Sequence, residues 1–402
     1  MNQPVEAHLM SHLMNNYSRQ PVTFTHGEGA WLHGTDGNRY LDALSGVAVN
    51  GLGHAHPKFV KALQDQVAKL IHVSNIYEVA EQAKLADKLA EISGMDNVFF
   101  CNSGCEANEA AFKLARLYGH NKGIENPEII VMERAFHGRT MATLSATGNR
   151  KAQAGFEPLV TGYIRVPFDD LESVKQVAHR SKNVVAIWVE PIQGEGGINV
   201  PTDVVAYLKG LREICDANDW LLLLDEVQSG IGRTGTWFAY QHAGIFPDVM
   251  SLAKGLGSGV PIGACLAKGK AAQVFTYGKH GSTFGGNPLA STAGLATLRI
   301  VEEEHLRENA TKMGDLICQL FRDALHGLAG VKHIRNAGLM IGIELDRPCG
   351  ELVKQALAAQ LLINVTSDTV VRLLPPLIIN EAEAREIVAR LAPLIVKLLS
   401  QK

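Results

Sequence analysis

The stretch VFFCNSGCEANEAAFKLARLY, residues 98–118, contains an apolar run, a polar turn and a helical pattern in direct succession. Val98–Cys101 has the length and composition of a buried strand, and apolar side chains recur at helical spacing over Glu106–Tyr118. Asn102-Ser103-Gly104 lies between them and predicts a helix start at about Cys105. This strand–turn–helix unit predicts an α/β domain built on a mostly parallel sheet.

The same alternation continues toward the C-terminus. Helical patterns such as Val204–Asn218 separate runs that are apolar along their whole length, as strands covered on both faces are. These predicted strands are Ile129–Met132, Val184–Val189, Leu221–Leu224, Val249–Leu252 and Ala264–Ala267. A ligand of such a sheet binds at the carboxyl ends of its strands.

The pattern changes after Asn287-Pro288. An Ala/Leu-rich segment running to about Leu325 predicts one long helix. It is followed by a predicted strand, helix, strand and closing helix, at Leu339–Leu345, Glu351–Gln360, Val370–Leu374 and from Glu381 onward. We therefore predict a large domain over 51–288, and a smaller α+β domain formed by the linking helix and C-terminal part, 289–402, joined by the N-terminal segment 1–50.

Composition excludes several classes of protein. A length of 402 residues suits two domains, and a composition of 46% hydrophobic and 20% charged residues is that of a soluble globular protein. The net charge of −3 gives no reason to expect nucleic acid or an anionic membrane as partner. We expect no signal peptide, and the apolar runs are far shorter than the roughly 20 residues of a membrane helix. Six scattered cysteines without a CxxC pair predict reduced thiols and a cytoplasmic protein. His54 and His56 lack an accompanying acidic or cysteine cluster, so we expect no metal site.

Three polar features follow predicted strands. Ser103 and Gly104 at a helix start can form a phosphate cradle, although Ser103 can equally be a simple N-cap. Asp225 directly follows a buried strand, where it either caps the chain or meets a cation such as a protonated pyridine nitrogen. Lys254 follows another strand and precedes glycines, so it is either a solvated loop lysine or a desolvated amine nucleophile. Together they predict a pyridoxal phosphate site.

The loop Gly230-Ile-Gly232-Arg-Thr-Gly235 matches GxGxxG, but the acid precedes the glycines and no convincing helix follows. A dinucleotide site requires the reverse order. We therefore interpret the match as accidental.

The ordered motifs resemble those of the class III aminotransferases of the fold-type I pyridoxal phosphate superfamily. The resemblance runs from Gly27-Glu-Gly to Arg372-Leu-Leu-Pro-Pro-Leu and includes Gly53-His-Ala-His-Pro57, Asn102-Ser-Gly-Cys-Glu-Ala-Asn-Glu109, Phe136-His-Gly-Arg-Thr140, Glu190-Pro-Ile-Gln-Gly-Glu-Gly-Gly197, Asp225-Glu-Val-Gln-Ser-Gly230, Ala253-Lys-Gly255 and Gly281-Ser-Thr-Phe-Gly-Gly-Asn-Pro288. It implies a seven-stranded, mostly parallel sheet in the large domain and a homodimer with shared active sites.

The resemblance also implies roles for single residues. Lys254 would bind the cofactor covalently and move the proton, and Asp225 would pair with the pyridine nitrogen. The remaining cofactor contacts would come from Ser103, Gly104, Cys105, Phe136, Val227 and Gln228, and from Thr283 of the neighbouring subunit. The family usually has alanine or threonine where Cys105 stands, a change that a backbone donor tolerates.

Substrate contacts are implied at a second set of positions. Arg139 and Arg372 would bind the two carboxylates of glutamate, and Glu195 would mask Arg372 when an ω-amino substrate binds. Each arginine could instead be an ordinary surface ion pair. Ser282 lies beside Thr283, and Val47 stands where ornithine-type enzymes have a tyrosine.

Val47 favours N-acetylornithine as amine donor and 2-oxoglutarate as acceptor, in arginine biosynthesis, because an acetamido group needs no partner for an ammonium. N-succinyl-diaminopimelate is a possible further substrate. Ornithine, succinylornithine and 4-aminobutyrate remain alternatives, as does a non-catalytic module that only binds the cofactor.

Overall fold

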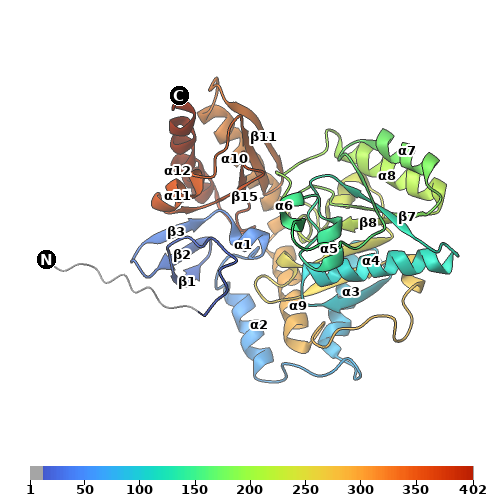
Figure 1. Ribbon diagram of the computed structural model, residues 1–402. Coiled ribbons are helices and arrows are strands. Elements are labelled where there is room, and N and C mark those ends of the chain that lie inside the picture. Colours follow the sequence, from blue (N-terminus) through green and yellow to red (C-terminus); the bar gives the residue numbers. More distant parts are fainter. Residues whose placement is uncertain (1–11, 402) are drawn as a thin grey trace.

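The computed structural model describes residues 12–401 and consists of a large and a small domain side by side (Figure 1). The large domain contains a seven-stranded sheet in the order β4-β10-β9-β8-β7-β5-β6. Its strands are β4 (Asn97–Cys101), β5 (Glu128–Met132), β6 (Tyr163–Val166), β7 (Val184–Val189), β8 (Leu221–Asp225), β9 (Val249–Leu252) and β10 (Gly263–Ala267). All pairs are parallel except the two that β10 makes with β4 and β9. The predicted mostly parallel α/β fold is thereby confirmed.

Both faces of this sheet are covered, because alternate residues of each strand enter different clusters of buried side chains. In β8, Leu221 and Leu223 pack with α4 (Gly104–Asn121), whereas Leu222 and Leu224 pack with α8 (Val204–Asn218). This two-sided burial explains why the strands are apolar throughout. The other helical segments before the small domain are α1 (Ser45–Ala48), α2 (Pro57–Val67), α3 (Ala80–Ser93), α5 (Met141–Ala146), α6 (Arg150–Gln153), α7 (Leu171–Arg180) and the short 3₁₀ turns Ala239–Ala243, Lys254–Leu256 and Ala271–Gln273.

The small domain combines two four-stranded sheets with C-terminal helices. One sheet has the order β11-β12-β15-β14, formed by Val331–Ala337, Met340–Leu345, Val370–Leu373 and Asn364–Thr366. The other has the order β1-β2-β3-β13, formed by Phe24–Glu28, Trp31–Gly34, Arg39–Asp42 and Leu361–Leu362. Since β13 pairs with β3, the N-terminal segment is part of the small domain's framework, and α11 (Leu352–Ala358) and α12 (Glu381–Ser400) complete it. The predicted limits at residues 50 and 288 stay a prediction.

The single long helix predicted from Asn287 to Leu325 is wrong. The segment forms α9 (Pro288–Glu303) and α10 (Leu306–Ala324), which are separated at His305. The backbone of His305 has φ of 52°, a left-handed conformation that interrupts a right-handed helix. Leu306 and Met313, which follow the break, are buried like the apolar residues before it. The Ala/Leu pattern therefore continues across the break and does not indicate it.

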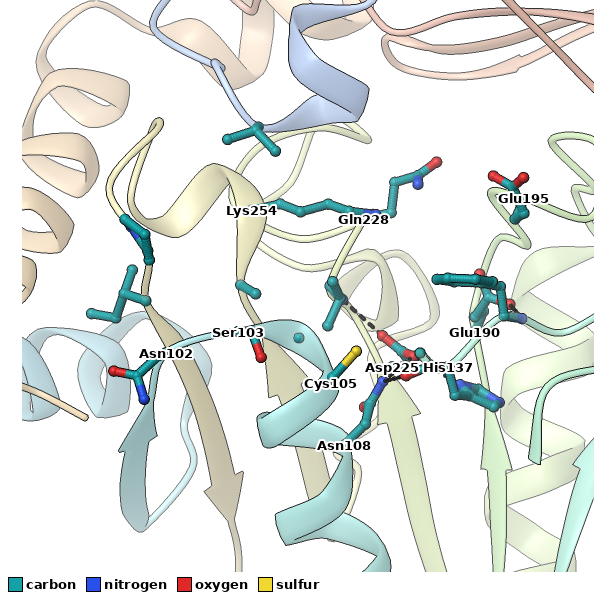
Figure 2. A pocket seen from close by; sticks show the side chains of 18 of the residues that line it. Asn102, Ser103, Cys105, Asn108, His137, Glu190, Glu195, Asp225, Gln228 and Lys254 are labelled. Carbon is teal, nitrogen blue, oxygen red and sulfur yellow. Dashed lines mark hydrogen bonds and ion pairs between the residues drawn. The ribbon is translucent and has the colours of Figure 1, made fainter. Parts of the chain in front are cut away.

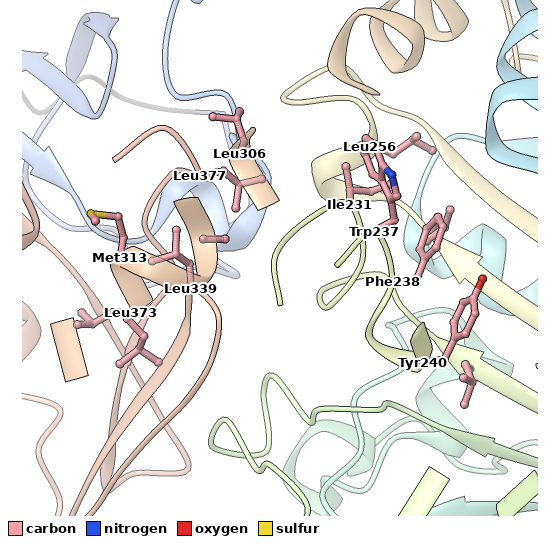
Figure 3. Close-up of a cluster of buried hydrophobic side chains, with 14 of the residues drawn as sticks. Ile231, Trp237, Phe238, Tyr240, Leu256, Leu306, Met313, Leu339, Leu373 and Leu377 are labelled. Atoms are coloured by element: carbon pink, nitrogen blue, oxygen red, sulfur yellow. The ribbon is translucent and has the colours of Figure 1, made fainter. Parts of the chain in front are cut away.

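A single cluster of buried side chains extends across both domains. Figure 3 shows Trp237 and Leu256 on the large-domain side and Leu339 and Leu377 on the small-domain side. Arg233 lies at the same junction, 3% exposed, and its Nη1 donates to the carbonyl oxygen of Pro375 at 2.5 Å. Burial lowers the pKa of Arg233 to about 9, so it stays protonated near neutral pH. This buried cation fixes the chain just beyond β15 against the large domain.

Candidate active site

A cavity of about 350 Å³ lies where the carboxyl ends of β7, β8 and β9 meet the start of α4 (Figure 2). This is the position at which open α/β sheets bind ligands. The structure brings many of the predicted residues into its wall: Ser103, Gly104, Cys105, Phe136, Glu195, Asp225, Val227, Gln228 and Lys254. They come from segments as far apart in sequence as residues 103 and 254.

The N-terminal end of α4 forms one side of the cavity. Ser103 is the N-cap residue, and its Oγ accepts a hydrogen bond from the N–H of Glu106 at 3.2 Å. A Cβ on Gly104 would lie 2.8 Å from Cγ1 of Val227, so a larger residue does not fit there without movement. The first N–H groups of the helix and its dipole favour an anion such as a phosphate in front of them. Ser103 is therefore both a cap and part of the cavity wall.

Asp225 ends β8 with its carboxylate only 4% exposed. Oδ2 accepts from Nδ1 of His137 at 2.8 Å and from Nδ2 of Asn108 at 2.8 Å, and Oδ1 accepts from the N–H of Val227 at 3.0 Å. Buried carboxylates need such donors. The carboxylate is thus held in one orientation at the cavity wall, where it can meet a cationic ring nitrogen.

His137 and Asn108 were not singled out from the sequence. His137 is fully buried and its ring stacks on Trp188, with centroids 4.1 Å apart and planes 18° apart. Asn108 lies on the buried side of α4, and its Nδ2 also donates to the carbonyl oxygen of His137 at 2.7 Å. A polar residue on the apolar side of a helix is the signal that could have found Asn108. Nothing in the local pattern indicates that His137 contacts Asp225, 88 residues away in sequence.

Lys254 begins the short 3₁₀ turn after β9 with φ of 43°, and Figure 2 shows its side chain extending toward Gln228. Burial and the nearby charge of Arg372 lower the pKa of Lys254 to about 8, against the opposing effect of Asp225 and Glu190. Near neutral pH an appreciable fraction of this amine is therefore unprotonated and able to attack an aldehyde. An ordinary exposed lysine is almost fully protonated at that pH.

Gln228 is another cavity residue with a polar group that pyridoxal phosphate could contact. Its Oε1 is buried, lines the cavity and has no hydrogen-bond partner among the described residues. It can lie there because position 194 is glycine, where a Cβ would come within 2.2 Å of that oxygen. A phenolic hydroxyl could donate to Oε1. Anion-binding N–H groups, a fixed carboxylate, a partly deprotonated amine and this unpaired amide match the phosphate, ring nitrogen, aldehyde and phenol of pyridoxal phosphate.

Glu190 is a further residue of the cavity that sequence reasoning missed as a site residue. Its carboxylate accepts from the N–H of Phe136 at 2.8 Å and of Gly194 at 3.1 Å. Burial and the charge of Asp225 raise the pKa of Glu190 to about 8. The signal was available, because Glu190 follows an apolar strand in the same way as Asp225 does. It fixes two loops of the cavity at once.

Arg372 and Glu195 meet at the junction of the two domains. Arg372 lies on β15, is 1% exposed, and donates from Nε to Oδ1 of Asn364 at 2.8 Å. Its Nη1 is 2.9 Å from Oε2 of Glu195, whose side chain is 46% exposed. Burial lowers the pKa of Arg372, and the Glu195 carboxylate opposes that effect. One partner is thus locked in the protein and the other can move toward solvent.

Arg372 itself is not part of the cavity wall, and four further predicted residues do not line the cavity within this chain either. Arg139 is exposed, with its guanidinium 5.8 Å from the ring centroid of Phe136. Ser282 and Thr283 lie in a separate surface hollow beside Phe99 and His280. Val47 packs with Ile192 and Met340, because the left-handed backbone at Gly46 and Val47 redirects the chain, and Val49 lines the cavity instead.

Comparison with known proteins gives a consistent result. The family model described as aminotransferase class-III matches residues 13–395. The chain is 61% identical to an acetylornithine aminotransferase of Nitrosomonas europaea, over 98% of this chain and 100% of that protein, and 48% identical to one of Methanocaldococcus jannaschii, over 91% of each. Among solved structures, the acetylornithine aminotransferase of Elizabethkingia anophelis superposes with a TM-score of 0.85 at 34% identity, covering 96% of each chain. The ornithine aminotransferase of Toxoplasma gondii gives 0.93 at 32% identity, covering 97% of this chain and 94% of that one.

Proposed function

The chain belongs to the class III aminotransferases, and on that premise we propose that it transfers the ω-amino group of N-acetylornithine to 2-oxoglutarate, with pyridoxal phosphate as cofactor. The products are N-acetylglutamate 5-semialdehyde and glutamate, as arginine biosynthesis requires. The high identity to acetylornithine aminotransferases over almost the whole chain supports this choice. A cytoplasmic location stays a prediction.

Bound pyridoxal phosphate supplies an aldehyde that binds amines and a ring that withdraws electrons from the adjacent carbon. Lys254 would provide the amine that holds the aldehyde, and the same amine would hold and move the proton at the reacting carbon of the substrate. Asp225 keeps a positive charge on the ring nitrogen favourable, and His137 with Asn108 holds Asp225 in place. The start of α4 would hold the phosphate, Gln228 would contact the phenolic oxygen, and Phe136 would pack against the ring, since all of them line the cavity.

The observation that carries the substrate proposal is the pair formed by Arg372 and Glu195. Glutamate brings a carboxylate next to its reacting amine, whereas N-acetylornithine brings none there. Arg372 is suited to the glutamate carboxylate. When N-acetylornithine binds instead, no substrate carboxylate is present there, and the buried guanidinium would be left without an anion. Glu195 supplies that anion while the ω-amine is bound. Because its side chain is half-exposed, it can move away from Arg372 when glutamate binds. Arg139, exposed near Phe136, binds the distant carboxylate.

Replacing Glu195 with glutamine tests this switch. We expect kcat/KM of the half-reaction with N-acetylornithine to fall about tenfold to a hundredfold, the range expected when a buried charge loses a half-exposed partner. The half-reaction with glutamate should change less than about threefold, because glutamate replaces Glu195 at Arg372. Single-turnover absorbance of the bound cofactor measures both. Glu213→Gln, at an exposed position of α8, is the control. Equal losses in both half-reactions would count against the switch.

The choice among ω-amines depends on the segment around Val47 and Val49. Val47 packs against buried apolar side chains next to the turn, and Val49 lines the cavity. This segment therefore presents apolar groups to the cavity and no partner for an ammonium group. That favours the acetylated amine over free ornithine. N-succinyl-diaminopimelate, which also has a neutral amide at the corresponding position, is a possible second substrate.

We also propose that the chain forms a homodimer with shared active sites. Ser282 and Thr283 lie outside the cavity of their own chain, in a loop that Asn75 ties to the segment before α3 through Nδ2 and the carbonyl oxygen of Ser282, at 2.9 Å. These two segments expose large apolar side chains: Leu70, Ile71, Ile76, Tyr77, Tyr277 and Phe284. Such a patch is typical of a protein interface, and a second copy of the chain would bring Thr283 to the neighbouring cavity. Sedimentation of the purified chain tests this.

A further inference from the structure

The carboxylate of Glu195 and the guanidinium of Arg372 come from different domains. Glu195 lies in the loop between β7 and α8, whereas Arg372 lies on β15 of the small domain. Gly194, Gly196 and Gly197 surround Glu195 and leave the backbone there many conformations, whereas the base of the loop is closed by backbone hydrogen bonds between Gln193 and Asn199. Contacts from the small domain add to this internal pairing at the tip of the loop, where Glu195 lies.

The backbone at the tip of the loop has conformations that residues other than glycine rarely adopt. Gly197 has φ of 120° and Ile198 has φ of 51°. A β-branched residue such as isoleucine rarely adopts a left-handed backbone, and such conformations persist only where the surroundings hold them. Ile198 is fully buried. It lies so close to Gly342 of β12 that a Cβ on Gly342 would be only 3.0 Å from the Cβ of Ile198. The small domain therefore packs directly on this strained turn.

Arg335 of β11 makes the polar contacts that fit this conformation. Its Nη2 donates to the carbonyl oxygen of Gly197 at 2.7 Å, and its Nε donates to that of Ile198 at 2.7 Å. Glu344 of the neighbouring strand β12 accepts from Nη1 at 2.6 Å. The planar guanidinium thus reaches two successive carbonyl groups with one edge while the carboxylate orients it. Thr366 adds a hydrogen bond to the carbonyl oxygen of Glu195 itself.

We propose that Arg335, oriented by Glu344, is a positioning residue that holds the 194–198 loop so that Glu195 lies beside Arg372. This inference rests on the proposed function. Arg335 acts through the backbone, which leaves the Glu195 side chain able to leave Arg372 when glutamate binds. Loss of the two carbonyl contacts lets the loop relax, so Glu195 spends less time at Arg372. Only the half-reaction that needs Glu195 there is then impaired strongly.

The test compares two half-reactions in three variants of the holoenzyme. In Arg335→Met, kcat/KM with N-acetylornithine should fall about tenfold, and kcat/KM with glutamate by about threefold or less. Arg335→Lys keeps the charge but cannot contact both carbonyls with a planar fork, so its loss should be intermediate. Arg347→Met is the matched control, because Arg347 also pairs with an acid, Asp346 at 2.8 Å, in the small domain without contacting this loop. It should resemble the unmodified chain.

Amide hydrogen exchange gives a readout independent of activity. Peptides that contain residues 194–199 should exchange faster in Arg335→Met than in Arg347→Met, and other parts of the sheet should not. Equal losses in both half-reactions of Arg335→Met while Glu195→Gln is selective, or unchanged exchange in this loop, would overturn the proposal in favour of a purely structural contact. If Arg335→Met does not fold, Arg335→Lys decides by the same two criteria.

Failure of the underlying function has a different signature. If Glu195→Gln impairs both half-reactions equally, the switch fails, and the selective loss predicted for Arg335→Met fails with it. Faster exchange confined to 194–199 would then still support the positioning of the loop by Arg335. If Glu195→Gln is selective and Arg335→Met is not, only the present inference is wrong.

Discussion

Replacing Lys254 with alanine should lower kcat of the complete reaction by a factor of about 10³ to 10⁴. General acid–base catalysis by a positioned side chain contributes up to about 10⁴-fold, and Lys254 is the partly deprotonated amine of the cavity. Glu190, another cavity group whose pKa is raised by burial, accepts hydrogen bonds from the N–H groups of Phe136 and Gly194 and cannot readily replace Lys254. Single-turnover kinetics with either amine donor measure the loss.

Two controls separate this role from general damage. Lys151→Ala removes a lysine whose side chain is 91% exposed, and it should leave kcat unchanged. The Lys254 variant should still retain pyridoxal phosphate on gel filtration at high cofactor concentration, because the phosphate and ring contacts remain. Borohydride reduction followed by peptide mass spectrometry should mark Lys254 in the unmodified chain only. A loss of less than about tenfold, or reduction at another lysine, would contradict the assignment.

The second largest effect is expected for Asp225→Asn, which should lower kcat by about 10² to 10³. A neutral amide cannot stabilise a positive ring nitrogen, and loss of one preorganised charged contact in a buried site has an effect of this size. The substitution also removes an acceptor from the donors around Asp225, because the amide N–H₂ would face either Nδ1 of His137 and Nδ2 of Asn108 together, or the N–H of Val227. Steady-state and single-turnover rates measure the loss.

The adjacent acid supplies a matched control. Glu226 is equally buried, but its carboxylate accepts from Ser229, Ala239 and Tyr240 and does not line the cavity. Glu226→Gln should therefore lower the free energy of unfolding by about 1–3 kcal/mol while leaving kcat of the folded protein within about threefold. If Asp225→Asn has no greater effect on kcat than Glu226→Gln, the interaction with the ring nitrogen is not important.

Much of the large domain could be predicted because its strands are covered on both faces. Val184–Val189 and Val204–Asn218 have the predicted bounds, since a continuous apolar run and an amphipathic pattern each determine one element. The edge strand Tyr163–Val166 was missed, because only one neighbour covers it and Arg165 interrupts its apolar character. The break at His305 was missed because a left-handed residue leaves the hydrophobic pattern intact.

The site was predictable where chemistry follows a strand directly in sequence. Asp225 and Lys254 carry that signal, and the structure places both in one cavity. Contacts that depend on the packing of the two domains carried no local signal. Neither the pairing of Arg335 with Gly197 nor that of His137 with Asp225 can be derived from residue spacing. The position of Val47 could not be predicted either. The left-handed backbone at Gly46 and Val47 places Val49, not Val47, in the cavity wall.

The most direct test of the proposed function is a spectral titration of the holoenzyme with single substrates. N-acetylornithine should convert the bound cofactor fully to its amine form, and 2-oxoglutarate should then restore the aldehyde form and release glutamate. Free ornithine and 4-aminobutyrate should do so at least about a hundredfold more slowly at equal concentration, which corresponds to about 2.7 kcal/mol of discrimination. Conversion by one of these amines alone would contradict the choice of substrate, and no conversion by any amine would contradict transamination itself.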